Sequence, residues 1–361
     1  MSVSKRPLPR EDLRALEGYH APQFDVSVRL NTNESPYGPP LEFVDAWLER
    51  LRDVPLNRYP DREARDLTDA IAARMSRDFR EIFAANGSNE VLQTLLLTYG
   101  GPTRRALVFE PTYALHSHLA RITGTALVVG ERTPEFGIDV TSACALIQAQ
   151  KPDIVFLCSP NNPSGTVDGR ATIEAVMAVA PGLVIVDEAY GEFSDWTAAD
   201  LVTADTPLVV VRTFSKVWSL AGLRLGFCIA PPWIVSELER VTLPYHLNAA
   251  TQAAGIVALE FGEQMEARVE MLVSERERLF TALAALDRIS VFPSGANFLL
   301  FRVDGGGRAL WEGLLERGVL IRDFSNWPGV EDCLRVTVGS PAENDLFLSA
   351  IGDALCEHGG P

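Results

Sequence analysis

The sequence contains few cysteines, and their spacing excludes two classes of site. There are five, at positions 144, 158, 228, 333 and 356. They lack the spacing of a metal site, and an odd number does not suit a disulfide framework. Cys158 and Cys228 lie within apolar runs, so we expect them to be small core residues. This usage is typical of a reducing compartment, and it predicts a cytoplasmic protein with no bound metal.

Positive charge and long apolar runs are also scarce. Lys plus Arg number 32 against 48 Asp plus Glu, so the 361 residues carry a net charge of −16. Such a chain repels nucleic acid and anionic membranes, although a local group of arginines can still bind a small anion. The N-terminal residues MSVSKRPLPR lack the apolar segment of a signal peptide, and no uncharged apolar run reaches the roughly 20 residues that span a bilayer. We expect no nucleic-acid or membrane partner.

Six segments rich in Val, Ile and Leu predict the strands of one large sheet. They are residues 105–110, 126–130, 153–158, 182–187, 207–212 and 225–230. Apolar residues fill these segments without alternation, which is typical of a sheet covered on both faces. Stretches with helical spacing, such as 170–180, lie between them. The expected fold class is α/β, with a large, doubly wound and mainly parallel sheet.

The pattern changes after about residue 250, which suggests a second domain. A long helical tract, 251–286, leads to two strands with more alternation, 296–303 and 333–339. A chain of this length is also expected to form about two domains. We predict an N-terminal arm (1–40) that packs on the small domain, a large cofactor-binding domain (41–250) and a small α+β domain (251–361).

Polar side chains lie at the ends of four of the six strands of the predicted large sheet. They are Tyr113 after the first strand, Asn161 and Asn162 after the third, Asp187 and Tyr190 at the fourth, and Thr213, Ser215, Lys216 and Arg224 after the fifth. Upstream, Ser88 and Asn89 begin an apolar-periodic helix. Each segment alone is typical of an ordinary turn or cap. Because ligands of open α/β sheets bind beyond the carboxyl ends of the strands, the whole set predicts one ligand site.

The residue types in this set indicate a particular cofactor. An amine such as that of Lys216 forms a Schiff base with an aldehyde. A carboxylate on a buried strand, here Asp187, keeps a pyridine nitrogen protonated and makes the ring an electron sink. Helix N-terminal N–H groups, hydroxyls and an arginine hold a phosphate. We therefore expect pyridoxal 5'-phosphate on Lys216. The competing interpretations are a solvated loop lysine and a structural buried aspartate.

Five segments resemble the aspartate-aminotransferase-like, fold-type-one pyridoxal-phosphate enzymes. They are LNTNESPYGPP (30–40), NGSNE (86–90), SPNNPSGT (159–166), VDEAY (186–190) and TFSKVWSLAGLRLG (213–226), and the resemblance covers essentially the whole chain. It implies catalytic roles for Lys216, Asp187 and Tyr113. In the cofactor site, Asp187 would pair with the ring nitrogen, Tyr113 would stack on the ring, Asn162 and Tyr190 would contact the 3′-oxygen, and Ser88, Asn89, Ser215 and Arg224 would hold the phosphate, with Thr213 a weaker candidate.

Three further segments are most similar to the histidinol-phosphate aminotransferases within that group. They are LNRYPD (56–61), GVLIRDFSNWPG (318–329) and CLRVTVG (333–339). The resemblance implies a substrate site of Tyr19, Asn33, Asn162, Arg322 and Arg335, in which the two arginines bind the substrate phosphate. It also implies a homodimer, in which Tyr59 crosses the two-fold interface to the partner's cofactor phosphate.

The reaction implied by this resemblance is an amino transfer from histidinol phosphate to 2-oxoglutarate. Its products are imidazole-acetol phosphate and glutamate, and its place is histidine biosynthesis. Lys216 would move the proton as general base and acid. A threonine-phosphate decarboxylase and an aromatic amino-acid aminotransferase are the alternatives. An effector module of a transcription factor is disfavoured, because this acidic chain leaves no room for a DNA-binding domain.

Overall fold

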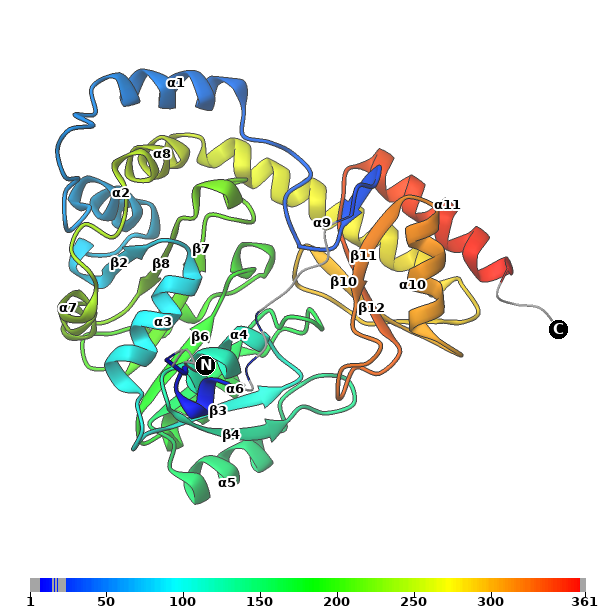
Figure 1. Cartoon of the computed structure of the whole chain (residues 1–361), viewed down its shortest axis with the longest axis horizontal. Coiled ribbons are helices and arrows are strands. Elements are labelled where there is room, and N and C mark those ends of the chain that lie inside the picture. Colours follow the sequence, from blue (N-terminus) through cyan, green and yellow to red (C-terminus); the bar gives the residue numbers. More distant parts are fainter. Residues whose placement is uncertain (1–6, 15, 17, 19–23, 358–361) are drawn as a thin grey trace, which may run out of the picture.

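The computed structural model describes residues 7–14, 16, 18 and 24–357, which form two sheets with helices around them. Tyr19, predicted to bind substrate, lies outside the described residues. A seven-stranded sheet and a five-stranded sheet lie at the two ends of the molecule in Figure 1. The long helix α9 (Gly262–Ala284) runs between them.

The seven-stranded sheet confirms the expected α/β class. Its strand order is β2 (Ile82–Ala85), β8 (Gly226–Ile229), β7 (Leu208–Thr213), β6 (Leu183–Asp187), β5 (Ile154–Cys158), β3 (Arg105–Glu110) and β4 (Ala126–Glu131). The five strands from β3 to β7 pair in parallel. All residues of β5, β6 and β7 are buried, as expected for strands without apolar alternation.

Two features of this sheet do not follow from the strand pattern. Strand β8 lies next to β7 but runs antiparallel to it, and β2, which we did not predict, pairs antiparallel with β8. A parallel return normally needs a crossover of a dozen or more residues, usually helical. The connection from β7 to β8 contains only one short 3-10 turn, Ala221–Leu223, so the chain returns antiparallel. This connection carries Lys216.

Helices cover both faces of the large sheet. They are α1 (Leu41–Arg52), α2 (Arg65–Met75), α3 (Ser88–Tyr99), α4 (Ala114–Ile122), α5 (Val140–Gln150), α6 (Arg170–Val179), α7 (Pro232–Val241) and α8 (Ala249–Glu260). Alternate residues of β7 point to opposite faces. Val209 and Val211 belong to the apolar cluster that contains residues of α3, α4 and α7. Leu208 and Val210 belong to the cluster that contains residues of α2, α5, α6 and α8. The sheet is therefore doubly wound.

The five-stranded sheet combines one strand of the arm with four strands from the C-terminal part of the chain. Its order is β1 (Val28–Leu30), β11 (Val319–Asp323), β12 (Cys333–Thr337), β10 (Phe298–Val303) and β9 (Ile289–Val291), with helices α10 (Gly307–Glu316) and α11 (Pro341–Glu357). Strand β1 pairs in parallel with β11, so the arm supplies an edge strand. Helix α8 contacts α1 and α2, whereas α9 contacts β9, β10 and α11. The division into residues 1–40, 41–250 and 251–361 stays a prediction. Among the described residues, no helix has the length and apolarity to cross a membrane.

Candidate active site

A cavity of about 360 Å³ lies at the carboxyl ends of β5, β6 and β7. Three regions line it: the arm (Thr32, Asn33, Glu34), the large sheet with its loops (Ser88, Asn89, Tyr113, Cys158, Asn162, Asp187, Ala189, Tyr190, Thr213, Ser215, Lys216, Ala221, Gly222, Arg224) and the small sheet (Arg335). Most of the predicted site residues are therefore neighbours. Arg322 and Tyr59 do not line this cavity.

Lys216 lies in the loop after β7, and its amine points toward the arm. Its Nζ donates a hydrogen bond to the carbonyl oxygen of Thr32 at 3.2 Å and lies 5.6 Å from the centroid of the Tyr190 ring. Burial, followed by the positive charge of Arg335, lowers the pKa of Lys216 to about 7. A large fraction of this amine is therefore neutral at physiological pH, as a nucleophile or proton acceptor requires.

Asp187 is the last residue of β6, and two groups hold its carboxylate in place. Oδ1 accepts a hydrogen bond from the N–H of Ala189 at 3.1 Å, and Oδ2 lies 2.9 Å from Nε2 of His116. His116 is fully buried in α4 and stacks on Phe156, with 4.7 Å between the ring centroids. We did not predict His116. It follows Tyr113 by three residues, in the first turn of the helix that begins directly after that tyrosine.

Tyr113 and Asn89 are neighbours at the edge of the cavity. Tyr113 precedes α4, and its hydroxyl lies 3.4 Å from Oδ1 of Asn89. Its ring meets that of His116 edge-on, with 5.5 Å between centroids. The aromatic face and the Asp187–His116 pair therefore come from adjacent parts of the fold.

The N-terminus of α3 and the lysine loop together form an anion cradle. Ser88 and Asn89 are the first residues of α3, after Gly87 with its φ of +79°. The hydroxyl of Ser215 accepts a hydrogen bond from Arg224 at 3.5 Å and one from Thr213 at 3.0 Å. Free helix N–H groups, hydroxyls and a guanidinium together suit a phosphate.

Close backbone approach explains two glycines around this cradle. A Cβ at Gly87 would lie 2.7 Å from a guanidinium nitrogen of Arg224, and one at Gly226 would lie 2.2 Å from the backbone nitrogen of Ser88. Glycine at these two positions therefore lets the backbone lie directly against the Arg224 guanidinium and the first residue of α3. With the Lys216 amine and the Asp187 carboxylate, the donors of the cradle fit the aldehyde, ring nitrogen and phosphate of pyridoxal 5'-phosphate.

Two arginines lie side by side on the small sheet, and one of them reaches the cavity. Arg335 of β12 donates to Oδ1 of Asn162 at 2.5 Å and to the carbonyl oxygen of Asn31 at 2.8 Å. Arg322 of β11 is opposite Arg335 in the strand register. Both are buried, and both guanidiniums lie within 6 Å of the Phe324 ring, at 5.8 Å and 5.4 Å from its centroid. The substrate contact of Arg322 stays a prediction.

The two consecutive asparagines after β5 have different roles. Asn161 is fully buried and binds within its own loop and to the preceding one, through Thr112 at 2.8 Å, the Pro111 carbonyl at 3.1 Å and Ser164 at 2.8 Å. Asn162 instead lines the cavity and contacts Arg335. Both asparagines belong to the predicted strand-end set, but only Asn162, to which a ligand contact was assigned, lines the cavity.

Asn33 fastens the arm to both sides of the cavity. Its side chain donates to the hydroxyl of Tyr190 at 2.9 Å, and its N–H donates to Oγ1 of Thr337 at 3.0 Å. Asn297 donates to the carbonyl oxygen of Asn33 at 3.2 Å. Burial raises the pKa of Tyr190 to about 12, so its phenol is protonated at neutral pH. Asn33 has a left-handed φ of +55°, a conformation that asparagine tolerates better than most residues.

The family model for aminotransferases of class I and II matches residues 26–351. The chain belongs to this family. It is 44% identical to the histidinol-phosphate aminotransferase of Corynebacterium efficiens, over 98% of this chain and 96% of that protein. It is 46% identical to that of Corynebacterium diphtheriae, over 94% of each chain. The solved structure of histidinol-phosphate aminotransferase from Sinorhizobium meliloti in complex with pyridoxal-5'-phosphate has the same fold, with a TM-score of 0.90, 21% identity and coverage of 99% of this chain and 100% of that one.

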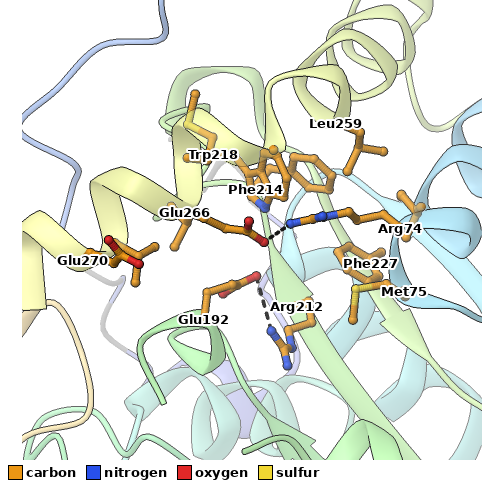
Figure 2. A pocket seen from close by; sticks show the side chains of 15 residues that line it. Arg74, Met75, Glu192, Arg212, Phe214, Trp218, Phe227, Leu259, Glu266 and Glu270 are labelled. Atoms are coloured by element: carbon orange, nitrogen blue, oxygen red, sulfur yellow. Dashed lines mark hydrogen bonds and ion pairs between the residues drawn. The ribbon is translucent and has the colours of Figure 1, made fainter. Parts of the chain in front are cut away.

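A second, larger cavity of about 620 Å³ lies behind the lysine loop of this aminotransferase (Figure 2). Phe214, Val217 and Trp218 line it, and none of the predicted site residues does. Ion pairs join Arg74 to Glu266 and Arg212 to Glu192, the latter at 3.3 Å. Burial raises the pKa of Glu192. The cavity that contains most of the predicted site residues is therefore the smaller of these two.

Tyr59 lies on the surface, away from the cavity in its own chain. Its side chain is 79% exposed, and its ring stacks on that of Tyr245 with 4.5 Å between centroids. Leu56 and Leu243 are also exposed. The contact of Tyr59 with a partner's cofactor phosphate stays a prediction.

Proposed function

We propose that this aminotransferase transfers the amino group of histidinol phosphate to 2-oxoglutarate, using pyridoxal 5'-phosphate, and so produces imidazole-acetol phosphate and glutamate. The observation that supports this proposal most is the position of Arg335, which lines the cavity that contains Lys216. Arg322 lies opposite Arg335 on the neighbouring strand β11. Two guanidiniums on one side of an aminotransferase site suit a phosphorylated amine. The curated relatives named above support the same substrate.

Each residue of the proposed site has a separate role in this reaction. When bound, the cofactor supplies an electron sink that stabilises negative charge at the substrate carbon. Lys216 would hold the aldehyde and, with its lowered pKa, accept and return the substrate proton. Asp187, kept in place by His116, would hold the ring nitrogen protonated. Ser88, Asn89, Ser215 and Arg224 would hold the phosphate of the cofactor.

The same arginines would receive both substrates in turn. Arg335 and Arg322 would bind the phosphate of histidinol phosphate and then the distal carboxylate of 2-oxoglutarate. Both ligands present an anion to the site, and a buried guanidinium binds either through charge-assisted hydrogen bonds. Asn33, Asn162 and Tyr19 complete the proposed substrate site.

The active unit is proposed to be a homodimer in the cytoplasm. The exposed ring of Tyr59, together with Leu56, Leu243 and Tyr245, supports a contact with a second copy. Tyr59 would then bind the partner's cofactor phosphate. The five free cysteines support a reducing compartment.

One assay separates this function from its two alternatives. Purified protein with pyridoxal 5'-phosphate is given histidinol phosphate, threonine phosphate or phenylalanine, each with 2-oxoglutarate, and glutamate and carbon dioxide are measured. We expect glutamate from histidinol phosphate at the highest kcat/KM. Carbon dioxide from threonine phosphate without glutamate would favour the decarboxylase, and a preference for phenylalanine would favour the aromatic aminotransferase.

A further inference from the structure

Glu34 is a carboxylate in the catalytic cavity that the cofactor chemistry does not use. Asp187 and Glu34 are the two carboxylates that line the cavity. Asp187 is buried, and each of its oxygens has a partner, Ala189 or His116. Glu34 is exposed and belongs to the arm. The two carboxylates therefore face different environments.

The backbone before Glu34 is anchored, so its side chain has a defined place. The preceding residue, Asn33, makes hydrogen bonds to Tyr190 and Thr337 and receives one from Asn297. Oε2 of Glu34 accepts a hydrogen bond from Oγ1 of Thr32 at 2.9 Å. Its other oxygen, Oε1, accepts none from any residue in the described part of the chain. One acceptor therefore remains available at the cavity.

The charge of Glu34 is close enough to act on the catalytic amine. It opposes the lowering of the Lys216 pKa by burial and by Arg335. The carbonyl of Thr32, two residues earlier, accepts a hydrogen bond from that same amine. The arm therefore brings a carboxylate into the same cavity as the Lys216 amine.

A substrate with three substituents on its reacting carbon needs three recognition groups. Under the proposed function, Lys216 acts at the amine, and Arg335 with Arg322 binds the phosphate. Most other polar side chains of the cavity are assigned to the cofactor, and Asn33 of the proposed substrate site already bonds Tyr190 and Thr337 through its side-chain amide. Those that remain, apart from the buried thiol of Cys158, are Thr32 and Glu34.

We propose that Glu34 recognises the ring of the substrate by accepting a hydrogen bond from an imidazole N–H group. This inference rests on the proposed function and adds a specificity-determining residue to it. A carboxylate accepts two hydrogen bonds readily, and one to a charged ring is stronger than one to a neutral donor. A phenyl ring of similar size offers no such donor. Glu34 thereby separates imidazole-bearing from phenyl-bearing amines.

The test compares two substrates that differ only in the ring. Histidinol phosphate and phenylalaninol phosphate share the amine and the phosphate. For Glu34→Ala we expect kcat/KM on histidinol phosphate to fall about tenfold or more, the loss of one charge-assisted hydrogen bond. For Glu34→Gln, kcat/KM on histidinol phosphate should fall less, because the amide oxygen still accepts a hydrogen bond from the imidazole N–H group. For both variants, kcat/KM on phenylalaninol phosphate should stay within about twofold of the wild-type value.

Glu42→Gln is the matched control, since Glu42 is an exposed carboxylate in the first turn of α1, outside the cavity. It should leave both substrates unchanged. Equal losses on both substrates in the Glu34 variants would overturn the inference and assign Glu34 to the arm. Unchanged kinetics on both would also overturn it, as for a solvated carboxylate. If wild-type enzyme used neither phosphate ester, the proposed function itself would fail.

Discussion

The two sides of the catalytic cavity are built in different ways. The cofactor side consists of loops that follow neighbouring parallel strands, with Asp187 on β6 and Lys216 after β7. The proposed substrate side combines Asn33 and Glu34 of the arm with Arg335 of β12, about three hundred residues later in the chain. A parallel sheet aligns its strand ends wherever it forms, so the first arrangement is robust. The second depends on how the arm and the small sheet pack, and it is therefore free to set specificity.

The largest effect is expected at Lys216, on the cofactor side. Lys216→Ala should lower multiple-turnover transamination by about four orders of magnitude or more, because both the anchoring amine and the proton carrier are lost. The chain has only three lysines, Lys5, Lys151 and Lys216, so borohydride reduction followed by peptide mapping gives a clear assignment. The label should be on Lys216. Lys151→Ala is the control, and normal turnover by the Lys216 variant would contradict the assignment.

Asp187 should give the next largest loss. Asp187→Ala should still fold and bind some cofactor, yet lose about two to three orders of magnitude in kcat, because the ring nitrogen loses its charged partner. His116→Asn removes the group behind the carboxylate and should cost less. Steady-state kinetics and the visible spectrum of the holoenzyme measure both. A loss of only two- or threefold for Asp187→Ala would make its role structural.

A substitution of Arg322 tests whether this side of the cavity binds the phosphate of the substrate. Arg322→Ala should lower kcat/KM for histidinol phosphate by about 30-fold or more, since a desolvated bidentate arginine–phosphate contact is worth ~2–4 kcal/mol. Phenylalaninol, which lacks the phosphate, should be affected far less. Arg335→Ala should show the same direction with a larger loss, because Arg335 lines the cavity. Equal losses on both substrates would mean that Arg322 only supports the small sheet.

A test on Tyr59 shows whether one chain supplies all the residues that hold its cofactor. Tyr59→Phe subunits are mixed with Lys216→Ala subunits, and activity is measured per hybrid dimer. The site that contains Lys216 then receives an intact Tyr59 from the partner, so one of two sites should recover the full Tyr59 contribution. No recovery would place Tyr59 in its own chain's site. A fully active monomer would also rule out the shared site.

The smallest expected effect is a pH dependence of the cofactor-free protein. The pKa of Lys216 is about 7 in the folded chain and about 10.4 when unfolded. Between these values the unfolded chain binds more protons, so the contribution of Lys216 to stability rises with pH and is lost as pH falls toward 7. The thermal midpoint of Lys216→Met should therefore exceed that of wild type more at pH 7 than at pH 9. A constant difference would contradict the lowered pKa.

Most of the cofactor side could be predicted from local sequence. Asn162 and Lys216 follow apolar strands and Asp187 ends one, and parallel pairing alone brings such positions together. In the structure, all three line one cavity. The roles of these residues and of the phosphate cradle stay predictions. His116 was missed, because a histidine on an amphipathic helix is ordinarily a core residue.

The chain's own pattern of strands, loops and polar residues was sufficient to predict the α/β class and the cofactor, and it predicts that Lys216 holds that cofactor. Tertiary structure was needed for the antiparallel β8, for the pairing of β1 with β11 and for the neighbouring positions of Arg322 and Arg335. It was also needed to bring Glu34 to the cavity. The physical reason is range. A polar residue at a strand end is recognised from the few residues around it. The arm and the small sheet instead meet through hydrogen bonds between distant segments, such as that from Asn33 to Thr337, and no local pattern specifies these partners.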